Sequence, residues 1–488
     1  MTQSEPTSSS QRIRRNQREI IRRVIVRGCL KLESPTSLGS GDADSPTDMP
    51  LLRDSISQHA LLTGSSISGA LRNYLRDCEH NYGARESSGD LATNLFGAIR
   101  RDDDGDQSPL IVYDAISTTA PTIELRDGVK IDSKTGTARD KAKYDLELLA
   151  AGTEFPLQFE LLVDRQADQN ELLQGLAIAL QGLENGEITL GMKKRRGFGR
   201  CKVSQWQVWD FDLTDLAQSR QWIEYDHWTP GFLTEPPAKQ SSILDAIKVS
   251  LDGLEDRRDR LTLQATFTIN GSLLIRSGQS SIGSAPDVVH LKSHRNGELK
   301  PVLSGTSLTG VLRHRAERII NTLEKPISII DEVFGPDFSE DKSKQAKVSR
   351  LIVQEAEIKN THDLVQNRIA IDRFTGGALH GALFDEQPIF GGEFTICLEL
   401  RQPKDYEIGL LLLLLKDLWT GDLPVGGESS IGRGRLQGQS AKVLHCHQGQ
   451  KQEWTIDQID QRLQVSDAEA LEKFVSALVN HISERNAA

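Results

Sequence analysis

Three short patterns occur twice in this 488-residue chain, in the same order and at nearly the same spacing. They are TGSSISGALR at 63–72 and SGTSLTGVLR at 304–313, IDSKTG at 131–136 and IDRFTG at 371–376, and GFGR at 197–200 and GRGR at 432–435. Each second copy follows the first by about 240 residues, and self-similarity at a fixed period indicates a repeated structural unit. The sequence therefore predicts a duplicated domain.

Length and composition agree with this interpretation. A chain of 488 residues is too long for one ordinary hydrophobic core and suits two domains of about 200 residues. The longest apolar run, IGLLLLLL at 408–415, is too short to span a membrane, and the N-terminal residues do not resemble a signal peptide. We expect a cytoplasmic protein with no membrane partner.

The metal-ligating residue types give a weak signal. The five cysteines have no CxxC spacing, so neither a disulfide framework nor a zinc site is indicated. His445, Cys446 and His447 form the one cluster of possible ligands. Because alternate residues of a strand point to opposite faces, we do not expect a metal there.

Charge is distributed unevenly along the chain. The net charge of −11 disfavours a protein coated in nucleic acid, but affinity depends on the phosphates that are touched. The segments 12–27 and 193–200 are strongly basic, whereas 102–106 and 252–259 are acidic. A basic groove on an acidic body is the simplest interpretation, and the alternative is that both basic runs are solvated faces.

The glycine-rich and serine-rich motifs have chemistry suited to phosphate. Glycines let the main chain approach a ligand closely, and neighbouring basic side chains supply charge. Ser65 or Ser66 can cap a helix whose first N–H groups form an anion site. The alternatives are a glycine hairpin with solvated basic residues and a capped amphipathic helix without a ligand.

Hydrophobic periodicity predicts an α+β fold of two tandem ferredoxin-like (RRM-like, βαββαβ) domains. Strands are expected at 20–32, 110–113, 155–163 and 201–208, and again at 261–274, 351–353, 392–400 and 436–444. Helices are expected from Ser65, at 169–183 and at 406–419. The predicted organisation is a disordered N-terminus (1–17), a first domain (18–209), a linker (210–257), a second domain (258–445) and a C-terminal helical extension (446–488).

The combined motifs resemble the RAMP superfamily of CRISPR systems, specifically the backbone subunits that line the guide RNA in type III effector complexes. In that family an aspartate loop precedes the GSSIxGxLR-type motif, then L-F-G, a thumb β-hairpin inserted in each domain with I-D-x-x-T-G, and a last glycine loop. Here LFG at 95–97 and VFG at 333–335 complete the two sets. Two fused backbone domains resemble the multi-domain subunits of type III-D complexes.

The resemblance implies that the chain grips the backbone of guide RNA (crRNA) and wedges each thumb into the guide–target duplex. The implied thumb residues are Ile131, Asp132, Thr135, Ile371, Asp372 and Thr375. The implied RNA contacts are Ser65, Ser66, Arg72, Lys193, Lys194, Arg195, Arg196, Gly197, Gly199, Arg200, Thr306, Ser307, Arg313, Gly432, Arg433, Gly434 and Arg435.

The resemblance also implies cleavage of complementary target RNA through its own 2′-hydroxyl, with Mg²⁺ or another divalent cation. TDMPLLRD at 47–54 places the catalytic residue at Asp48. PDVVHLKS at 286–293 places Asp287 in the second half, where the matching proline is missing and Ser293 stands in the place of Asp54. The aspartate could hold a metal or accept a proton, and a turn-capping aspartate is the non-catalytic alternative. His290 is expected at the surface.

The leading hypothesis is therefore a metal-dependent endoribonuclease that acts only within an assembled complex. Its expected partners are guide RNA, target RNA, other backbone RAMP proteins, a large polymerase-like subunit and a small subunit. Two alternatives remain: a non-catalytic guide-binding scaffold of the same complex, and a guide-processing endonuclease, which the aspartate loop disfavours.

Overall fold

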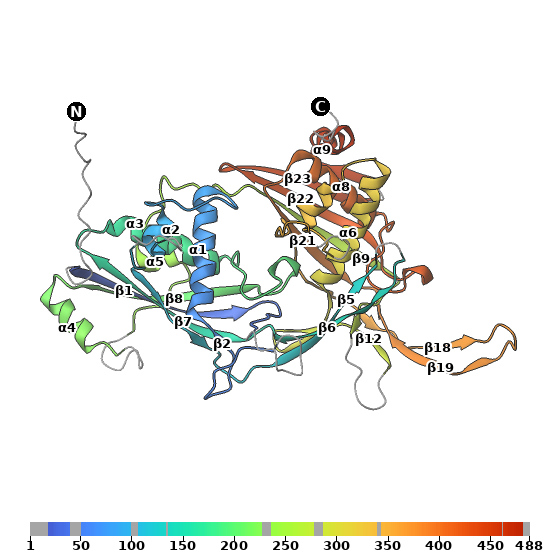
Figure 1. The fold of residues 1–488 in the computed structure, drawn as a ribbon, viewed down its shortest axis with the longest axis horizontal. Coiled ribbons are helices and arrows are strands. Elements are labelled where there is room, and N and C mark those ends of the chain that lie inside the picture. Colours follow the sequence, from blue (N-terminus) through green and yellow to red (C-terminus); the bar gives the residue numbers. More distant parts are fainter. Residues whose placement is uncertain are drawn as a thin grey trace.

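The chain folds as two halves that lie side by side (Figure 1). A computed structural model describes residues 18–39, 50–98, 106–132, 135–226, 236–277, 286–338, 343–460 and 462–481. Apolar side chains between Val24 and Ile247 form one large core, and those between Leu261 and Leu478 form another. Each half therefore has its own core, as expected for a duplication.

The first half is built on a four-stranded antiparallel sheet of order β3-β7-β1-β8. Alternation along β1 places Val24 and Val26 in the core and Ile25 on the other face. The strands are β1 (Ile20–Leu32), β3 (Leu110–Val112), β7 (Glu154–Asp164) and β8 (Cys201–Asp212), and the helices are α1 (Gly64–His80), α2 (Leu91–Phe96), α3 (Gln169–Glu184), α4 (Leu216–Glu224) and α5 (Ile243–Ile247).

The second half repeats this arrangement and extends it. Its sheet has the order β15-β21-β9-β22-β23-β24, so four strands match those of the first half and two more follow. The strands are β9 (Arg260–Asn270), β15 (Leu351–Val353), β21 (Glu393–Arg401), β22 (Arg435–His447), β23 (Gln450–Ile459) and β24 (Arg462–Val465), and the helices are α6 (Gly305–Thr322), α7 (Ser328–Phe334), α8 (Asp405–Trp419) and α9 (Ala468–Asn480).

Two long β-hairpins extend from the halves at the positions expected for thumbs. The first thumb, β5 (Ile123–Ile131) and β6 (Ala138–Leu149), runs from the first half against the second (Figure 1). The second thumb, β18 (Gln366–Ile371) and β19 (Ala378–Gln387), projects beyond the body of the second half (Figure 1). The first thumb therefore has a neighbour along its length, and the second has none among the residues that the structure describes.

Short strands join these parts. The strand β12 (Val288–His290) pairs with β19 at the base of the second thumb. The others are β2 (Leu61–Leu62), β4 (Ala115–Ile116), β10 (Ser272–Leu273), β11 (Arg276–Ser277), β13 (Lys292–Arg295), β14 (Glu298–Leu303), β16 (Ala356–Glu357), β17 (His362–Asp363) and β20 (Ile389–Phe390).

Several predicted boundaries differ from the structure. The segment 446–488 was predicted as a helical extension, but β23 and β24 lie in it before α9, and Leu471 and Leu478 of α9 belong to the second core. The predicted linker 210–257 begins inside β8, and Ile243 and Ile247 of α5 are buried in the first core. The predicted disordered segment 1–17 lies outside the described residues.

Candidate nucleic-acid interface

The two glycine loops have the same backbone conformation. Gly199 and Gly434 have φ values of 80° and 78°, which side chains rarely tolerate. A Cβ atom there would lie 1.9 Å from the carbonyl oxygen of Leu190 or Val425 respectively. Their amides donate to Pro35 O at 3.0 Å and Ser272 O at 2.8 Å. These glycines are required by the fold, and their N–H groups are not directed at a phosphate.

The basic residues of the first loop surround a short 3₁₀ helix, η2 (Lys194–Arg196). Lys193 has its Nζ 3.8 Å from the centre of the Tyr144 ring, while Lys194 and Arg196 are exposed. Burial, and then repulsion by Arg401, lower the pKa of Arg195 to about 10. Its Nη1 atom is buried and has no hydrogen-bond partner among the described residues. The basic residues 193–196 therefore form no ion pair among the described residues.

The second loop, around η3 (Ser429–Ile431), is different in charge. Arg433 is only 3% exposed, and its Nη1 lies 3.0 Å from Glu386 and 2.5 Å from Glu428. Phe198 stands at the matching place in the first half, where it is buried against Leu146 and Leu148. This position joins each glycine loop to the base of its thumb, by ion pairs in one half and by apolar packing in the other.

The remaining arginines of these loops also have partners within the chain. Arg200 donates from Nη1 to Gln354 Oε1 at 2.9 Å and pairs through Nη2 with Glu33 at 2.9 Å. Arg435 donates to the carbonyl oxygen of Gly421 at 2.9 Å. Arg200 thus connects the halves, whereas Arg435 remains exposed on its own half.

The first capped helix begins at Gly64, one residue before the expected start, and its cap is Thr63 and not Ser65 or Ser66. The side chains of Thr63 and Ser304 cap α1 and α6 by accepting from the amides of Ser66 and Ser307, each at 3.3 Å. Ser65 and Ser66 are therefore in the first turn of α1, where both are exposed. In α6 the matching Thr306 and Ser307 are half-buried.

Thr306 and Ser307 are less exposed than Ser65 and Ser66 because the first glycine loop lies at the start of α6. A Cβ atom on Gly305 would be 2.4 Å from the carbonyl oxygen of Arg196, and one on Gly197 would be 2.5 Å from the amide nitrogen of Glu355. Within the described residues, the start of α1 instead has Asp114, which accepts from the Gly64 amide at 2.6 Å. The glycine loop of one half thus packs on the capped helix of the next.

Arg72 and Arg313 hold equivalent structural contacts. Arg72 donates from Nη2 to the carbonyl oxygen of Gly97 at 3.1 Å and pairs with Glu86 at 2.5 Å. Arg313 donates from Nη1 to the carbonyl oxygen of Gly335 at 2.7 Å. Both glycines end the short helix that carries the L-F-G-type motif. In this conformation neither guanidinium is presented to a ligand.

The I-D-x-x-T-G motif forms the turn at the tip of each thumb. The amides of Gly136 and Gly376 donate to the carbonyl oxygens of Asp132 and Asp372, both at 2.9 Å. The Asp132 carboxylate accepts from the Thr135 amide at 3.0 Å. An aspartate that hydrogen-bonds the backbone just after it stabilises a tight turn. The motif therefore sets the shape of the tip.

The strands beside these turns expose apolar side chains. On the second thumb Phe374 is fully exposed and Ile371 is 64% exposed, and Leu383 is 65% exposed. On the first thumb Ile131 and Val129 are 42% and 47% exposed. Solvated apolar side chains grouped on a projecting hairpin are typical of an interaction surface.

A buried polar network docks the first thumb on the second half. Arg126 pairs with Glu355, and Glu124 accepts from His294 Nδ1 at 3.0 Å and from Ser293 Oγ at 3.1 Å. Burial would raise the pKa of Glu355, but Arg126 and Arg295 lower it. Ser293, at the place of Asp54, is thus part of the contact between halves.

The structure describes only one of the two predicted catalytic aspartates. Asp48 lies outside the described residues. The flanking residues Gly39 and Leu51 pair with one another, and the Leu51 amide donates to Glu147 of the thumb base at 3.3 Å. Asp287 is exposed, and its Oδ2 accepts from the Asp385 amide at 3.1 Å. The described residues that flank Asp48, and Asp287 itself, therefore adjoin the base of a thumb.

The expectation that His290 lies at the surface was wrong. The side chain is only 2% exposed, because His290 is on β12 with its ring inside the second half. The ring accepts from the Ile275 amide and lies 3.2 Å from the carbonyl oxygen of Val302. Burial lowers the pKa of His290 to about 4, so the ring is neutral at neutral pH.

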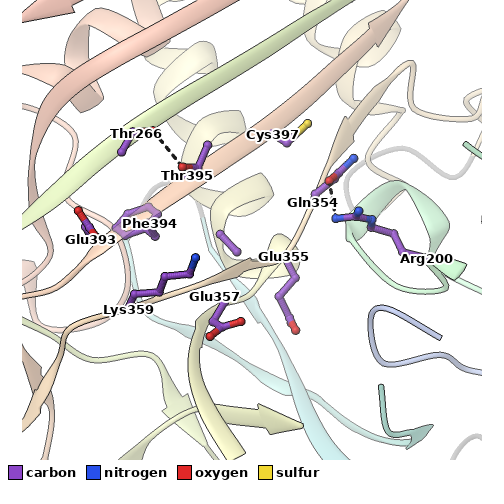
Figure 2. Close-up of a pocket in the computed structure, with 11 residues that line it drawn as sticks. Arg200, Thr266, Gln354, Glu355, Glu357, Lys359, Glu393, Phe394, Thr395 and Cys397 are labelled. Atoms are coloured by element: carbon purple, nitrogen blue, oxygen red, sulfur yellow. Dashed lines mark hydrogen bonds between the residues drawn. The ribbon is translucent and has the colours of Figure 1, made fainter. Parts of the chain in front are cut away.

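A polar pocket lies where the first glycine loop meets the second sheet (Figure 2), and its volume is about 500 Å³. Arg200 enters it from the first half, and Lys359 and Glu357 face it from the second. Thr266 and Thr395 hydrogen-bond across adjacent strands at 2.9 Å on its floor. The pocket was not anticipated from the sequence, because its walls come from segments far apart in the chain.

The two α+β halves share a glycine loop, a capped helix and a thumb, so the chain consists of two tandem domains of one type. Residues 29–202 and 266–437 match the family model of the RAMP superfamily. These ranges cover most of the chain, so the chain belongs to the RAMP superfamily, whose members are CRISPR-associated RNA-binding subunits. No curated protein matches the sequence significantly. Among the described residues, no helix is long and apolar enough to cross a membrane.

Proposed function

We propose that this chain is a guide-RNA-binding backbone subunit of a type III CRISPR complex, and that it cleaves complementary target RNA at two loop aspartates. The observation that carries the proposal is the shared position of the described residues that border the two aspartate loops. These bordering residues adjoin both a glycine loop and a thumb base. The Met192 amide donates to Ser37 O at 3.0 Å beside the first loop, and Arg276 pairs with Glu428 at 2.9 Å beside the second. Guide, target and aspartate would then meet at one place in each half.

The charge on the first glycine loop supports the guide-binding part of the proposal. Lys194 and Arg196 are exposed, and the buried Nη1 of Arg195, near the cationic Arg401, has no hydrogen-bond partner among the described residues. Like charges held together are relieved by an anion such as a phosphate. The second loop has Glu428 and two serines at the matching places, so its affinity for the guide should be lower.

The strand order supports a ferredoxin-like interpretation of each half. In order of appearance, the core elements of the first half are β1, α1, β3, β7, α3 and β8, with β1 and β7 at the centre of the antiparallel sheet. This is the βαββαβ sequence of elements. In the second half β9, β15, β21 and β22 take the same places, and β23 and β24 are additions.

The residues near Asp287 suit a hard divalent cation such as Mg²⁺. Asp287 is exposed, and the adjacent Asp385 has a buried Oδ1 without a hydrogen-bond partner among the described residues. Mg²⁺ binds through one or two carboxylates together with phosphate oxygens and water. A cation held here would stabilise charge on the scissile phosphate, while Asp287 and Asp385 would orient it.

The test is the product pattern of a labelled complementary target. With the assembled complex and Mg²⁺ we expect two adjacent cuts, and a chelator should abolish both. Asp48→Ala should remove one cut and Asp287→Ala the other, while guide and target binding persist. If both cuts survive the double replacement, the nuclease belongs to another subunit and this chain is the non-catalytic scaffold.

Contact between the halves also supports neighbouring RAMP subunits as partners. The glycine loop of the first half packs on α6, and the first thumb packs along the second half. The second glycine loop and second thumb have no such neighbour within the described residues. A following backbone subunit would occupy these surfaces in the same way.

A further inference from the structure

Two histidines and an aspartate converge where the chain enters the second half. His445 Nε2 lies 3.0 Å from Asp259 Oδ1, and His447 Nδ1 lies 3.3 Å from Asp259 Oδ2. All three ligand atoms lie within 4.8 Å of one another. In a tetrahedral site with bonds of about 2.0–2.2 Å, ligand atoms are about 3.3 Å apart. The two distances from Asp259 to the histidines are close to this value, and the two histidine nitrogens lie within 4.8 Å of one another.

The spacing of the histidines on β22 explains their position. Residues two apart on a strand share a face, so His445 and His447 point the same way and Cys446 points to the other face. The sequence-based prediction that no metal binds here compared only adjacent residues, whose side chains point to opposite faces of the strand. It did not consider the pair two residues apart, nor Asp259, which lies about 190 residues earlier in the chain and could not be associated with them from the sequence.

Asp259 is held in place by contacts of its own backbone. Its amide donates to Asn81 Oδ1 of the first half at 3.0 Å, and its carbonyl oxygen accepts from the Gln402 amide at 2.8 Å. Only its carboxylate is directed at the imidazoles. Such prior positioning lowers the conformational entropy lost when an ion binds.

Among the described residues, the neighbouring strand β23 places no cation opposite the two histidines. On β23, Gln452 pairs with His445 and Gln450 pairs with His447, so the cross-strand neighbours are neutral amides. Lys451 pairs with Cys446 and so belongs to the opposite face. His447 is 54% exposed, which leaves an entry path and room for water as a further ligand.

We propose that His445, His447 and Asp259 bind a divalent transition-metal ion of the zinc type. Imidazole nitrogens and a carboxylate are ligands that Zn²⁺ accepts, whereas Mg²⁺ prefers oxygen ligands alone. The ion connects the residue before β9 to the end of β22, where the two halves join. This site is separate from the aspartate loops, and its existence does not depend on RNA cleavage.

The experiment measures Zn²⁺ and Co²⁺ binding to the full chain after removal of metal with a chelator. The expected result is one Zn²⁺ per chain in competition with a chromophoric indicator, with visible Co²⁺ absorption bands typical of low coordination number. Zn²⁺ should also raise the melting temperature. Because His447 is half exposed, His447→Ala should fold normally and lose the binding, the bands and the shift.

Matched variants separate this cluster from others. Asp259→Asn retains the shape of the side chain and should also lose the ion. The control is His80→Ala, which removes the ring from a second cluster, Glu79, His80 and Asp90, and should leave binding intact. Absence of binding in the wild type overturns the proposal. So does binding that survives His447→Ala and Asp259→Asn, or that is lost in His80→Ala.

Discussion

At the scale of single residues, variants of Arg72 can distinguish a structural role from a role in RNA binding. Arg72 and Arg313 each donate to the glycine carbonyl at the end of a short helix, and Arg72 also pairs with Glu86, which is 10% exposed. Removal of one partner from a largely buried pair leaves the other charge unpaired. Arg72→Met should therefore lower the free energy of unfolding by about 2 kcal/mol in urea titrations.

RNA retention measured on the folded fraction of Arg72→Met should equal that of the wild type. A variant with normal stability and weakened guide binding would contradict the structural role and support the contact implied by the family resemblance. Either result decides between the two assignments, because stability and guide retention are measured independently.

The first glycine loop, in contrast to Arg72, should affect guide binding directly. Replacing Lys193, Lys194, Arg195 and Arg196 with neutral residues should weaken retention of guide RNA and flatten its salt dependence, because each lost phosphate contact removes counterion release. Replacing Arg433 and Arg435 should change guide binding less. A quadruple variant with unchanged affinity and salt slope would exclude this loop as a guide contact.

Burial of His290 makes the stability of the second half depend on pH. Its pKa is about 4 in the folded chain and near 6.5 when unfolded. Between these values the unfolded chain binds a proton that the folded chain excludes, so stability falls as pH decreases. Relative to pH 7, the wild type at pH 5 should lose about 2 kcal/mol more than His290→Gln. Equal losses, measured by urea unfolding, would contradict this.

At the scale of elements, much of the fold was predictable from local pattern. The predicted strands at 20–32 and 351–353 coincide with β1 and β15, because apolar alternation or a short apolar run marks them. The strands β23 and β24 were not predicted. Their stretch is mostly polar, and Trp454 and Ile456 are buried only because the second core covers that face.

The candidate site was predictable as a set of loops but not as a set of contacts. Gly199 and Gly434 occupy equivalent tight turns in the two halves, as the repeated motif indicated. In contrast, Arg433 resembles an exposed phosphate ligand in sequence, yet it is buried against Glu386 about 50 residues away. Pairing between distant residues cannot be read from a single chain, and this is why Arg433 was assigned to RNA.

The second thumb provides a test at this scale. Because Phe374 is fully exposed and Ile371 is 64% exposed, replacing both with serine should leave the free energy of unfolding within about 0.5 kcal/mol. If the thumb wedges into the guide–target duplex, the variant should lose or shift the adjacent cut in the labelled target. Unchanged products would show that the tip does not contact the duplex.

At the scale of the whole molecule, the contact between the halves is heterologous: the glycine loop of one meets the capped helix of the next. Such a contact is not closed, so it can be repeated by further subunits. The exposed parts are the second glycine loop, where Ile431 is 52% exposed, and the start of α1, where Ser65 and Ser66 are exposed. These are the two ends of one repeating arrangement.

The last prediction follows from the two different ends of this repeating arrangement. Ile431→Glu places a charge on the surface that the following subunit would cover, so reconstituted complexes should end after this chain, as seen by mass measurement. Ser66→Arg should instead block the preceding subunit, because the matching Ser307 is half-buried beneath the first glycine loop. Neither variant should alter unfolding of the isolated chain. If both assemble fully, the contact between the halves is not a template for the complex, and its neighbours bind elsewhere.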